Sequence, residues 1–272
     1  MPEAERVPVR PNDMDIAFSP RLSRPAVVKP ARKNECVISE APIVVAAADR
    51  PLRERPSEDP VVSEFVQAAL AADDQVIKSL VDRLLAQGMS VQSIYLDLLA
   101  PTARALGDMW SDDSRDFVEV TMAVGRLQLV LRDLSQMFVR DRPEEQVAGR
   151  VLLACVPGDQ HSLGLFMVAE FFVRDGWEVH VGPPLSDEQL LADVRTEWYD
   201  IVGFSVSCDS RLDHLKREIR RVRQASKNQK VLILAGGRAF NENPGLLARV
   251  GADASAANAE LAPGRARQLL EM

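Results

Sequence analysis

The sequence predicts a two-part α/β protein, in which a four-helix bundle is followed by a doubly wound parallel sheet. Between about residues 60 and 142, apolar residues recur with the 3.6-residue period of amphipathic helices. After Arg150, short continuous apolar runs alternate with helical stretches, which is typical of strands buried on both faces of a parallel sheet. Together these two patterns account for residues 60–142 and 150–272.

The segment that precedes the bundle differs in composition. Residues 1–59 contain nine of the chain's 17 prolines, and no apolar period of 2 or 3.6 is sustained in them. Prolines recur there too often for a helix or a central strand. We therefore expect residues 1–59 to form a disordered tail.

Composition excludes several classes of protein. The formal net charge of −7 argues against a protein whose main task is to grip nucleic-acid phosphates. No run of 18 apolar residues is present, so no membrane span is expected. The three cysteines, Cys36, Cys155 and Cys208, share no close spacing, which predicts reduced thiols in a cytoplasmic protein.

Four helices are expected in the bundle. The first covers residues 61–71, and the second begins after Asp73, a good N-cap, and ends before Gly88. A third helix is capped by Ser90 and runs to Trp110, and a fourth covers residues 117–139. Short connections between helices of this length indicate an antiparallel arrangement.

Strands and helices then alternate over about 120 residues. Strands are expected at 151–156, 178–181, 201–206 and 231–235, with a weak fifth at 252–256. Helices are expected at 163–175, 187–198, 212–225, 244–250 and 260–271. Such alternation predicts a flavodoxin-like sheet whose ligand binds at the carboxyl ends of the strands.

Three short motifs fall at those strand ends. The first strand is followed by a loop with Asp159, His161, Ser162 and Gly164; the third by Ser205-Val206-Ser207; and the fourth by Gly236-Gly237. A lone histidine in such a loop is usually an ordinary polar residue, and a Gly-Gly pair is usually a tight turn. Found at equivalent places in one sheet, however, the three motifs are predicted to meet in one crevice.

These motifs resemble the B12-binding domain that is shared by methionine synthase, cobalamin mutases and B12-dependent regulators. Its pattern is Asp-x-His-x-x-Gly, about 40 residues, Ser-x-Leu, then 26–28 residues and Gly-Gly. The chain matches the pattern except at Ser207, where the family usually has leucine, and this departure falls in the region that holds the buried nucleotide tail. The matching positions are Asp159, His161, Gly164, Ser205, Gly236 and Gly237, with 40 residues between Gly164 and Ser205 and 28 between Ser207 and Gly236.

The resemblance implies a role for each position. His161 would be the cobalt ligand, displacing the benzimidazole base of cobalamin, and Asp159 would fix its tautomer and raise its basicity. Gly164 would let the next helix approach the corrin tail, and the freed tail would lie beside Ser205, Gly236 and Gly237.

The bundle resembles the cap of B12 photoreceptor regulators, which covers the upper face of the corrin. There a tryptophan lies over the upper ligand and a Glu-His pair follows on the next helix; Trp110, Phe117 and Glu119 fit this layout, while Val120 replaces the histidine. The alternative for Trp110 and Phe117 is an ordinary place in the bundle core. The remaining histidines, His180 and His214, are expected to be surface residues.

Residues 60–272 most resemble the AerR/PpaA group of photosynthetic proteobacteria. The resemblance implies an antirepressor, not an enzyme, that binds hydroxocobalamin or adenosylcobalamin and acts on a CrtJ/PpsR-type repressor, so that DNA is affected only indirectly. No helix-turn-helix pattern is visible, and the length leaves no room for a substrate domain. Two alternatives stay open: a corrinoid carrier of a methyltransferase system, and a haem-responsive regulator that uses His161 or Cys155 as the axial ligand.

Overall fold

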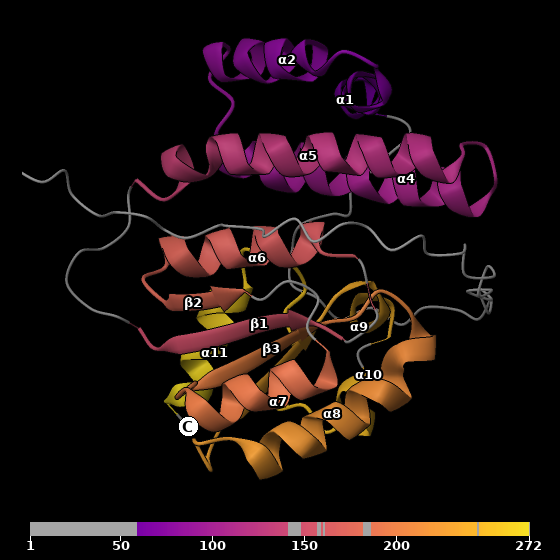
Figure 1. Cartoon of the computed structure of the whole chain (residues 1–272). Helices are drawn as coiled ribbons and strands as arrows, with labels where there is room; N and C mark the ends of the chain where they lie inside the picture. Colours follow the sequence, from indigo (N-terminus) through magenta and orange to yellow (C-terminus); the bar gives the residue numbers. More distant parts are fainter. Residues whose placement is uncertain are drawn as a thin grey trace, which may run out of the picture. The chain divides into compact units, whose positions relative to one another are not determined.

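The computed structural model describes residues 59–140, 148–156, 159, 161–181, 186–243 and 245–271. Within these residues a set of helices is followed by a parallel sheet with helices on both faces, as Figure 1 shows. The predicted fold class is confirmed. The proposed tail at 1–59 lies, apart from Asp59, outside the described residues.

The helical part contains the four predicted helices, each within a residue or two of its expected ends. They are α1 (Pro60–Leu70), α2 (Asp74–Ala86), a third helix made of α3 (Val91–Ser93), η1 (Ile94–Leu99) and α4 (Ala100–Ser111), and α5 (Phe117–Phe138). Asp73 and Ser90 accept the N-cap hydrogen bonds expected of them. Asp116 forms a full capping box with Glu119 at the start of α5.

The middle of the third helix is π-helical, which the sequence analysis did not predict. Ala100 N–H donates to Tyr95 O, a bond that spans five residues where an α-helix spans four. Pro101 follows directly; it has no N–H to donate, and its ring would clash with the carbonyl four residues earlier in an α-helix. The wider turn accommodates this proline.

The bundle core continues onto the first helix of the sheet domain, α6 (Leu163–Arg174). Leu163, Met167 and Phe171 of α6 belong to the same cluster of buried apolar side chains as Leu127 and Leu131 of α5. Polar contacts join the same two helices: Ser135 Oγ donates to Glu170 at 2.8 Å, and Gln128 Nε2 donates to Ser162 Oγ at 3.3 Å. The bundle is thus packed directly on the helix that follows the first strand.

The sheet consists of four parallel strands, β1 (Arg150–Cys155), β2 (Glu178–Val181), β3 (Ile201–Ser205) and β4 (Leu232–Gly236), in the order β2-β1-β3-β4. Their register pairs Cys155 with Ser205 and Ser205 with Gly236. The carboxyl ends of β1, β3 and β4 are therefore level, and the three motif-bearing loops leave the sheet at one edge.

Helices cover both faces of the sheet. The core on one face joins strand residues to α6 and α11 (Ala262–Leu270), and the core on the other joins them to α7 (Asp187–Thr196), α8 (Leu212–Ala225) and α10 (Leu246–Val250). Two short helices that were not predicted, η2 (Asp209–Arg211) and α9 (Arg238–Glu242), follow β3 and β4.

The prediction of a weak fifth strand at 252–256 is wrong. Only an isolated bridge between Leu234 and Ala254 forms there among the described residues. The carboxylate of Asp253 accepts the N–H of Ile233 at 2.6 Å. A side-chain oxygen thus takes the donor that a fifth strand would have used, and the ladder does not extend.

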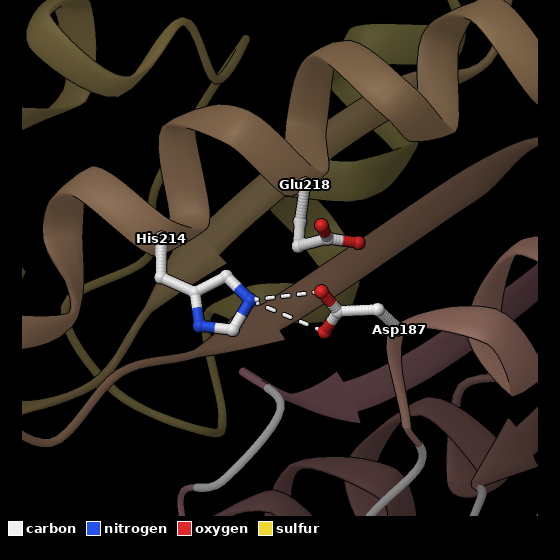
Figure 2. A group of neighbouring side chains, drawn as sticks. All are labelled: Asp187, His214 and Glu218. Atoms are coloured by element: carbon white, nitrogen blue, oxygen red, sulfur yellow. Dashed lines mark hydrogen bonds and ion pairs between the residues drawn. The ribbon is translucent and has the colours of Figure 1, made fainter.

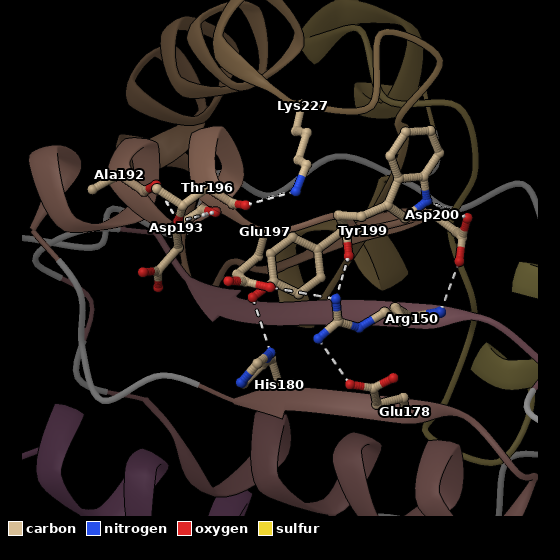
Figure 3. Close-up of polar contacts among 11 residues, drawn as sticks. Arg150, Glu178, His180, Ala192, Asp193, Thr196, Glu197, Tyr199, Asp200 and Lys227 are labelled. Atoms are coloured by element: carbon tan, nitrogen blue, oxygen red, sulfur yellow. Dashed lines mark hydrogen bonds and ion pairs between the residues drawn. The ribbon is translucent and has the colours of Figure 1, made fainter.

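A polar cluster lies at the opposite edge of the sheet, around the start of β1 (Figure 3). Arg150 forms an ion pair with Glu178 at 2.8 Å and lies over the ring of Tyr199, while its backbone N–H donates to Asp200. The hydroxyl of Tyr199 is hydrogen-bonded to His180 Nδ1 at 2.9 Å. His180 is an exposed residue of this cluster, as expected, and lies away from the predicted crevice. No helix in the described ranges is long and apolar enough to cross a membrane.

Candidate functional site

The loop after β1 holds a buried carboxylate against an exposed imidazole. Asp159 is 4% exposed, whereas 67% of the His161 side chain is exposed. Asp159 Oδ1 lies 2.6 Å from His161 Nδ1 and also accepts the backbone N–H of His161 at 3.0 Å. Two bonds to one oxygen therefore fix both the backbone and the ring of His161.

The protonation states follow from this contact. Burial by itself would raise the pKa of Asp159, but hydrogen bonds from His161 and Ser207 outweigh it and hold the pKa well below its usual range. The hydrogen bond to Asp159 raises the pKa of His161. An ionised carboxylate can only accept, so Nδ1 carries a proton, and in the neutral form of the ring the lone pair is on Nε2. Among the described residues, Nε2 has no hydrogen-bond partner.

Ser207 completes this group from the neighbouring loop. Its Oγ donates to Asp159 Oδ2 at 2.7 Å, and its backbone N–H points at the same oxygen at 3.2 Å. From the sequence, Ser207 was expected only in the region of the nucleotide tail, as a departure from leucine. Its position just after the strand next to β1 was the signal that it could reach the loop of Asp159.

The glycine pair after β4 divides into two different roles. Gly237 has φ +106°, and a Cβ there would lie 2.9 Å from Val206 N and closer still to Val206 O. The close approach of two backbones therefore requires glycine at 237. A Cβ at Gly236 would meet no atom within 4 Å, and the same holds for Gly164 on the first turn of α6. Gly236, at the end of β4, and Gly164, in α6, therefore each border open space.

The predicted cap residues lie around the connection from α4 to α5. Trp110 is 39% exposed and Phe117 is 62% exposed, with ring centroids 6.4 Å apart, so neither belongs to the bundle core. Glu119 accepts from the backbone N–H of Asp116 and from Arg115, and is thereby part of the helix cap. Val120 is half-buried against the bundle core.

The structure thus brings some of the predicted residues together and not others. Asp159, His161 and Ser207 are joined by hydrogen bonds, and Ser205 and Gly236 by strand register. No described ring contact or hydrogen bond joins Trp110 or Phe117 to His161. The nearest described link between α4 and the strand ends is a 3.3 Å ion pair from Asp108 to Arg238, the residue after Gly237. Gly158 and Gln160, the residues on either side of Asp159, lie outside the described residues.

Two family models match the chain, and both are described as a B12 binding domain. One covers residues 149–264 and the other residues 61–134. The chain carries a B12-binding domain. The matched ranges include the sheet with all three motif loops, and most of the helical bundle.

Individual proteins are also similar to this chain over most of their own length. An uncharacterized 20.5 kDa protein from the bchF-crtJ intergenic region of Rhodobacter capsulatus is 29% identical over 177 residues, 64% of this chain and 90% of that protein. A corrinoid protein of Desulfitobacterium hafniense is 20% identical over 179 residues, 65% of this chain and 83% of that protein. The structure of the monomethylamine corrinoid protein of Methanosarcina barkeri shares the fold, with a TM-score of 0.66 at 17% identity, covering 77% of this chain and 98% of that one.

Proposed function

We propose that this B12-binding domain would hold cobalamin with His161 as a ligand of cobalt. The observation that carries the proposal is the Asp159–His161 pair: a buried carboxylate fixes Nδ1, and the ring presents Nε2 away from that contact. Neutral imidazole backed by a carboxylate is a well-established arrangement for metal ligation. The cofactor would supply a cobalt ion whose upper ligand can be exchanged.

The remaining site residues would position the cofactor. The open space at Gly236 and Gly164 suits a group that approaches the backbone closely, as the nucleotide tail would. Ser205 lies half-buried between the ends of β1 and β4, next to Gly236 in the strand register. Ser162 and Gly237 would act indirectly, Ser162 by tying the His161 loop to α5 and Gly237 by placing Gly236.

We further propose that the chain is a regulator and not an enzyme, an antirepressor of the AerR/PpaA type. Two observations support this role. The Rhodobacter relative is from the bchF-crtJ intergenic region, and the resemblance to the AerR/PpaA group implies action on a CrtJ/PpsR-type repressor. Trp110 and Phe117 are exposed aromatic side chains on the bundle, available to cover an upper ligand or a partner protein.

The proposed signal would pass from the cofactor to the bundle. Light or ligand exchange would alter the group above cobalt and its packing against Trp110, with Phe117, Glu119 and Val120 nearby. Such a change would act on the contact of α5 with α6, where the described bonds Gln128–Ser162 and Ser135–Glu170 accompany a shared apolar core. The partner would be a CrtJ/PpsR-type repressor, and DNA would respond through it.

The test is capture of the repressor by the full chain, without cofactor, with hydroxocobalamin, and with adenosylcobalamin in darkness and after illumination. The proposal expects capture to change with cofactor or light, and the His161→Ala variant to lose that change. Equal capture by the wild-type chain in all conditions would contradict the regulatory role.

A corrinoid methyl carrier is the second candidate, favoured by the corrinoid protein among the relatives and by the fold of the monomethylamine corrinoid protein. A carrier would give up a cobalt-bound methyl group to a thiol acceptor in the presence of a methyltransferase, and it would do so equally in light and darkness. Methylcobalamin-loaded protein, assayed for demethylation with such an enzyme, distinguishes the two.

A further inference from the structure

A second group of ligand-type side chains lies between α7 and α8, the helices that cover the face of the sheet opposite α6 and α11. Asp187 is the first residue of α7, and His214 and Glu218 lie one turn apart on α8. Figure 2 shows the imidazole of His214 facing the carboxylate of Asp187, with the carboxylate of Glu218 beside them. Nothing in the proposed cobalamin site uses these residues.

The donor atoms are close enough to share one ion. His214 Nε2 lies 3.1 Å from Asp187 Oδ1 and 3.3 Å from Oδ2. One ligand atom from each of Asp187, His214 and Glu218 lies within 4.8 Å of the others. A zinc ion bound at about 2.0–2.2 Å by one nitrogen and two oxygens needs donor atoms separated by distances of this order. Small side-chain rotations would bring the three groups to that geometry.

An unpaired buried oxygen gives independent support. Glu218 is 1% exposed, and its Oε2 has no hydrogen-bond partner among the described residues. Buried polar atoms in proteins are almost always hydrogen-bonded or bound to an ion, since leaving a carboxylate oxygen unpaired is costly. Figure 2 shows that the carboxylate of Glu218 lies on the side of α8 that faces Asp187.

We propose that Asp187, His214 and Glu218 form a binding site for a divalent transition metal ion, with Zn²⁺ as the fitting representative. A histidine and a glutamate four residues apart lie on one face of a helix and can ligate together. An aspartate from the neighbouring helix adds the third ligand, and the two carboxylates balance the double charge of the ion. The mixed nitrogen and oxygen donors favour zinc-like ions over Ca²⁺ or Mg²⁺.

Arg221 is the internal competitor of the metal. Its Nη1 donates to Glu218 Oε1 at 2.6 Å and to Asp187 Oδ2 at 3.0 Å, so the guanidinium neutralises the carboxylates of the metal-free chain. The Arg221 side chain is 41% exposed and can leave for solvent. Metal binding would replace this arginine and link α7 to α8 through the ion.

The test is a titration of the full chain with Zn²⁺, using matched variants at four positions. His214→Asn and Glu218→Gln are expected to weaken zinc binding at least tenfold and to remove one bound equivalent. His180→Asn, which changes an exposed histidine of β2 outside the proposed zinc site, is the control and should retain the wild-type affinity. Arg221→Gln should bind zinc several-fold more tightly, because it removes the competing cation while keeping a polar side chain.

Two further measurements keep the outcome interpretable. Zinc should raise the melting temperature of the wild-type chain and of His180→Asn, but not of His214→Asn, so a merely misfolded variant is recognised by its own melting curve. Repeating the titration on cobalamin-loaded protein separates this site from His161. Unchanged zinc affinity in both His214→Asn and Glu218→Gln, or weaker binding in Arg221→Gln, would overturn the proposal.

Discussion

Ser207 Oγ lies 2.7 Å from Asp159 Oδ2, so the loop after β3 holds the carboxylate that in turn holds His161. Removing the hydroxyl in Ser207→Ala leaves the backbone N–H of residue 207 as a weaker donor to the same oxygen. We predict a few-fold loss of hydroxocobalamin affinity, or about 1 kcal/mol, which is less than the roughly 1.5–3 kcal/mol of a hydrogen bond to a charged group because the backbone N–H remains. Titration by absorption measures it, and Ser207→Thr, which keeps the hydroxyl, should retain most of the affinity.

Asp159→Asn should have a larger effect than Ser207→Ala. An amide can still face Nδ1, but it carries no charge to raise the basicity of the ring, and substituting such partners typically costs about 10- to 100-fold in metal affinity. The spectrum of bound hydroxocobalamin should also shift toward the form without histidine. An Asp159→Asn affinity equal to that of the wild type would show that the pair does not support a metal ligand.

The two neighbouring glycines provide a matched pair. Gly237→Ala places a Cβ against the backbone of Val206 at φ +106°, so we predict a loss of about 2 kcal/mol or more in the free energy of unfolding. Gly236→Ala meets no atom within 4 Å, and its stability should change by less than about 0.5 kcal/mol.

Gly236→Ala, the variant expected to be stable, is the one expected to be impaired in cobalamin binding. Gly236→Ala fills the space assigned to the nucleotide tail and should weaken cobalamin binding although the protein remains stable. Urea unfolding and cobalamin titration, performed on the same preparations, check both statements. Normal cobalamin affinity in Gly236→Ala would remove Gly236 from the proposed site.

Glu170 gives a pH-dependent prediction at the contact between α5 and α6. Burial raises its pKa, and the hydrogen bond from Ser135 only partly opposes this. The pKa of this carboxyl is higher in the folded chain than its value of about 4.3 in the unfolded chain. The folded chain therefore loses stability as pH rises from below the unfolded pKa through the folded pKa. Glu170→Gln should therefore unfold at higher urea concentration than the wild type at pH 7. At pH 4 the two proteins should unfold alike; a Gln variant that is less stable at pH 7 would contradict this account.

Cys155 tests the haem alternative. The thiol is buried at the end of β1, and burial together with the charge of Asp159 raises its pKa to about 12. Since the thiolate is the form that ligates iron, Cys155 is a poor axial ligand. Cys155→Ala should leave any haem spectrum unchanged and Cys155 should resist iodoacetamide in the folded chain; loss of the haem spectrum in this variant would favour the alternative.

The order of elements could be predicted from the sequence because periodicity depends on which face of each element is buried. Asp73 and Ser90 cap their helices as expected, and β2 was placed at its observed ends. The π-helical turn before Pro101 and the bridge at Ala254 could not be predicted, since both depend on how particular backbone donors are satisfied in the folded chain.

The candidate site, like the fold, could be predicted from the sequence only in part. The contact of Asp159 with His161 follows from their spacing of two residues, but the contact of Ser207 with Asp159 depends on the positions of two loops 48 residues apart. His214 was expected to be an ordinary surface residue, because its partner Asp187 lies on another helix and no local pattern joins them.

The central claim is that His161 Nε2 coordinates cobalt, and the absorption spectrum of bound hydroxocobalamin tests it most directly. The wild-type chain should show the shift that accompanies replacement of benzimidazole by a protein imidazole. His161→Ala should bind more weakly and give the spectrum of the free cofactor, while His180→Ala should behave as the wild type. An identical, shifted spectrum in the wild type and His161→Ala, or failure of the wild-type chain to bind any corrinoid, would contradict the assignment.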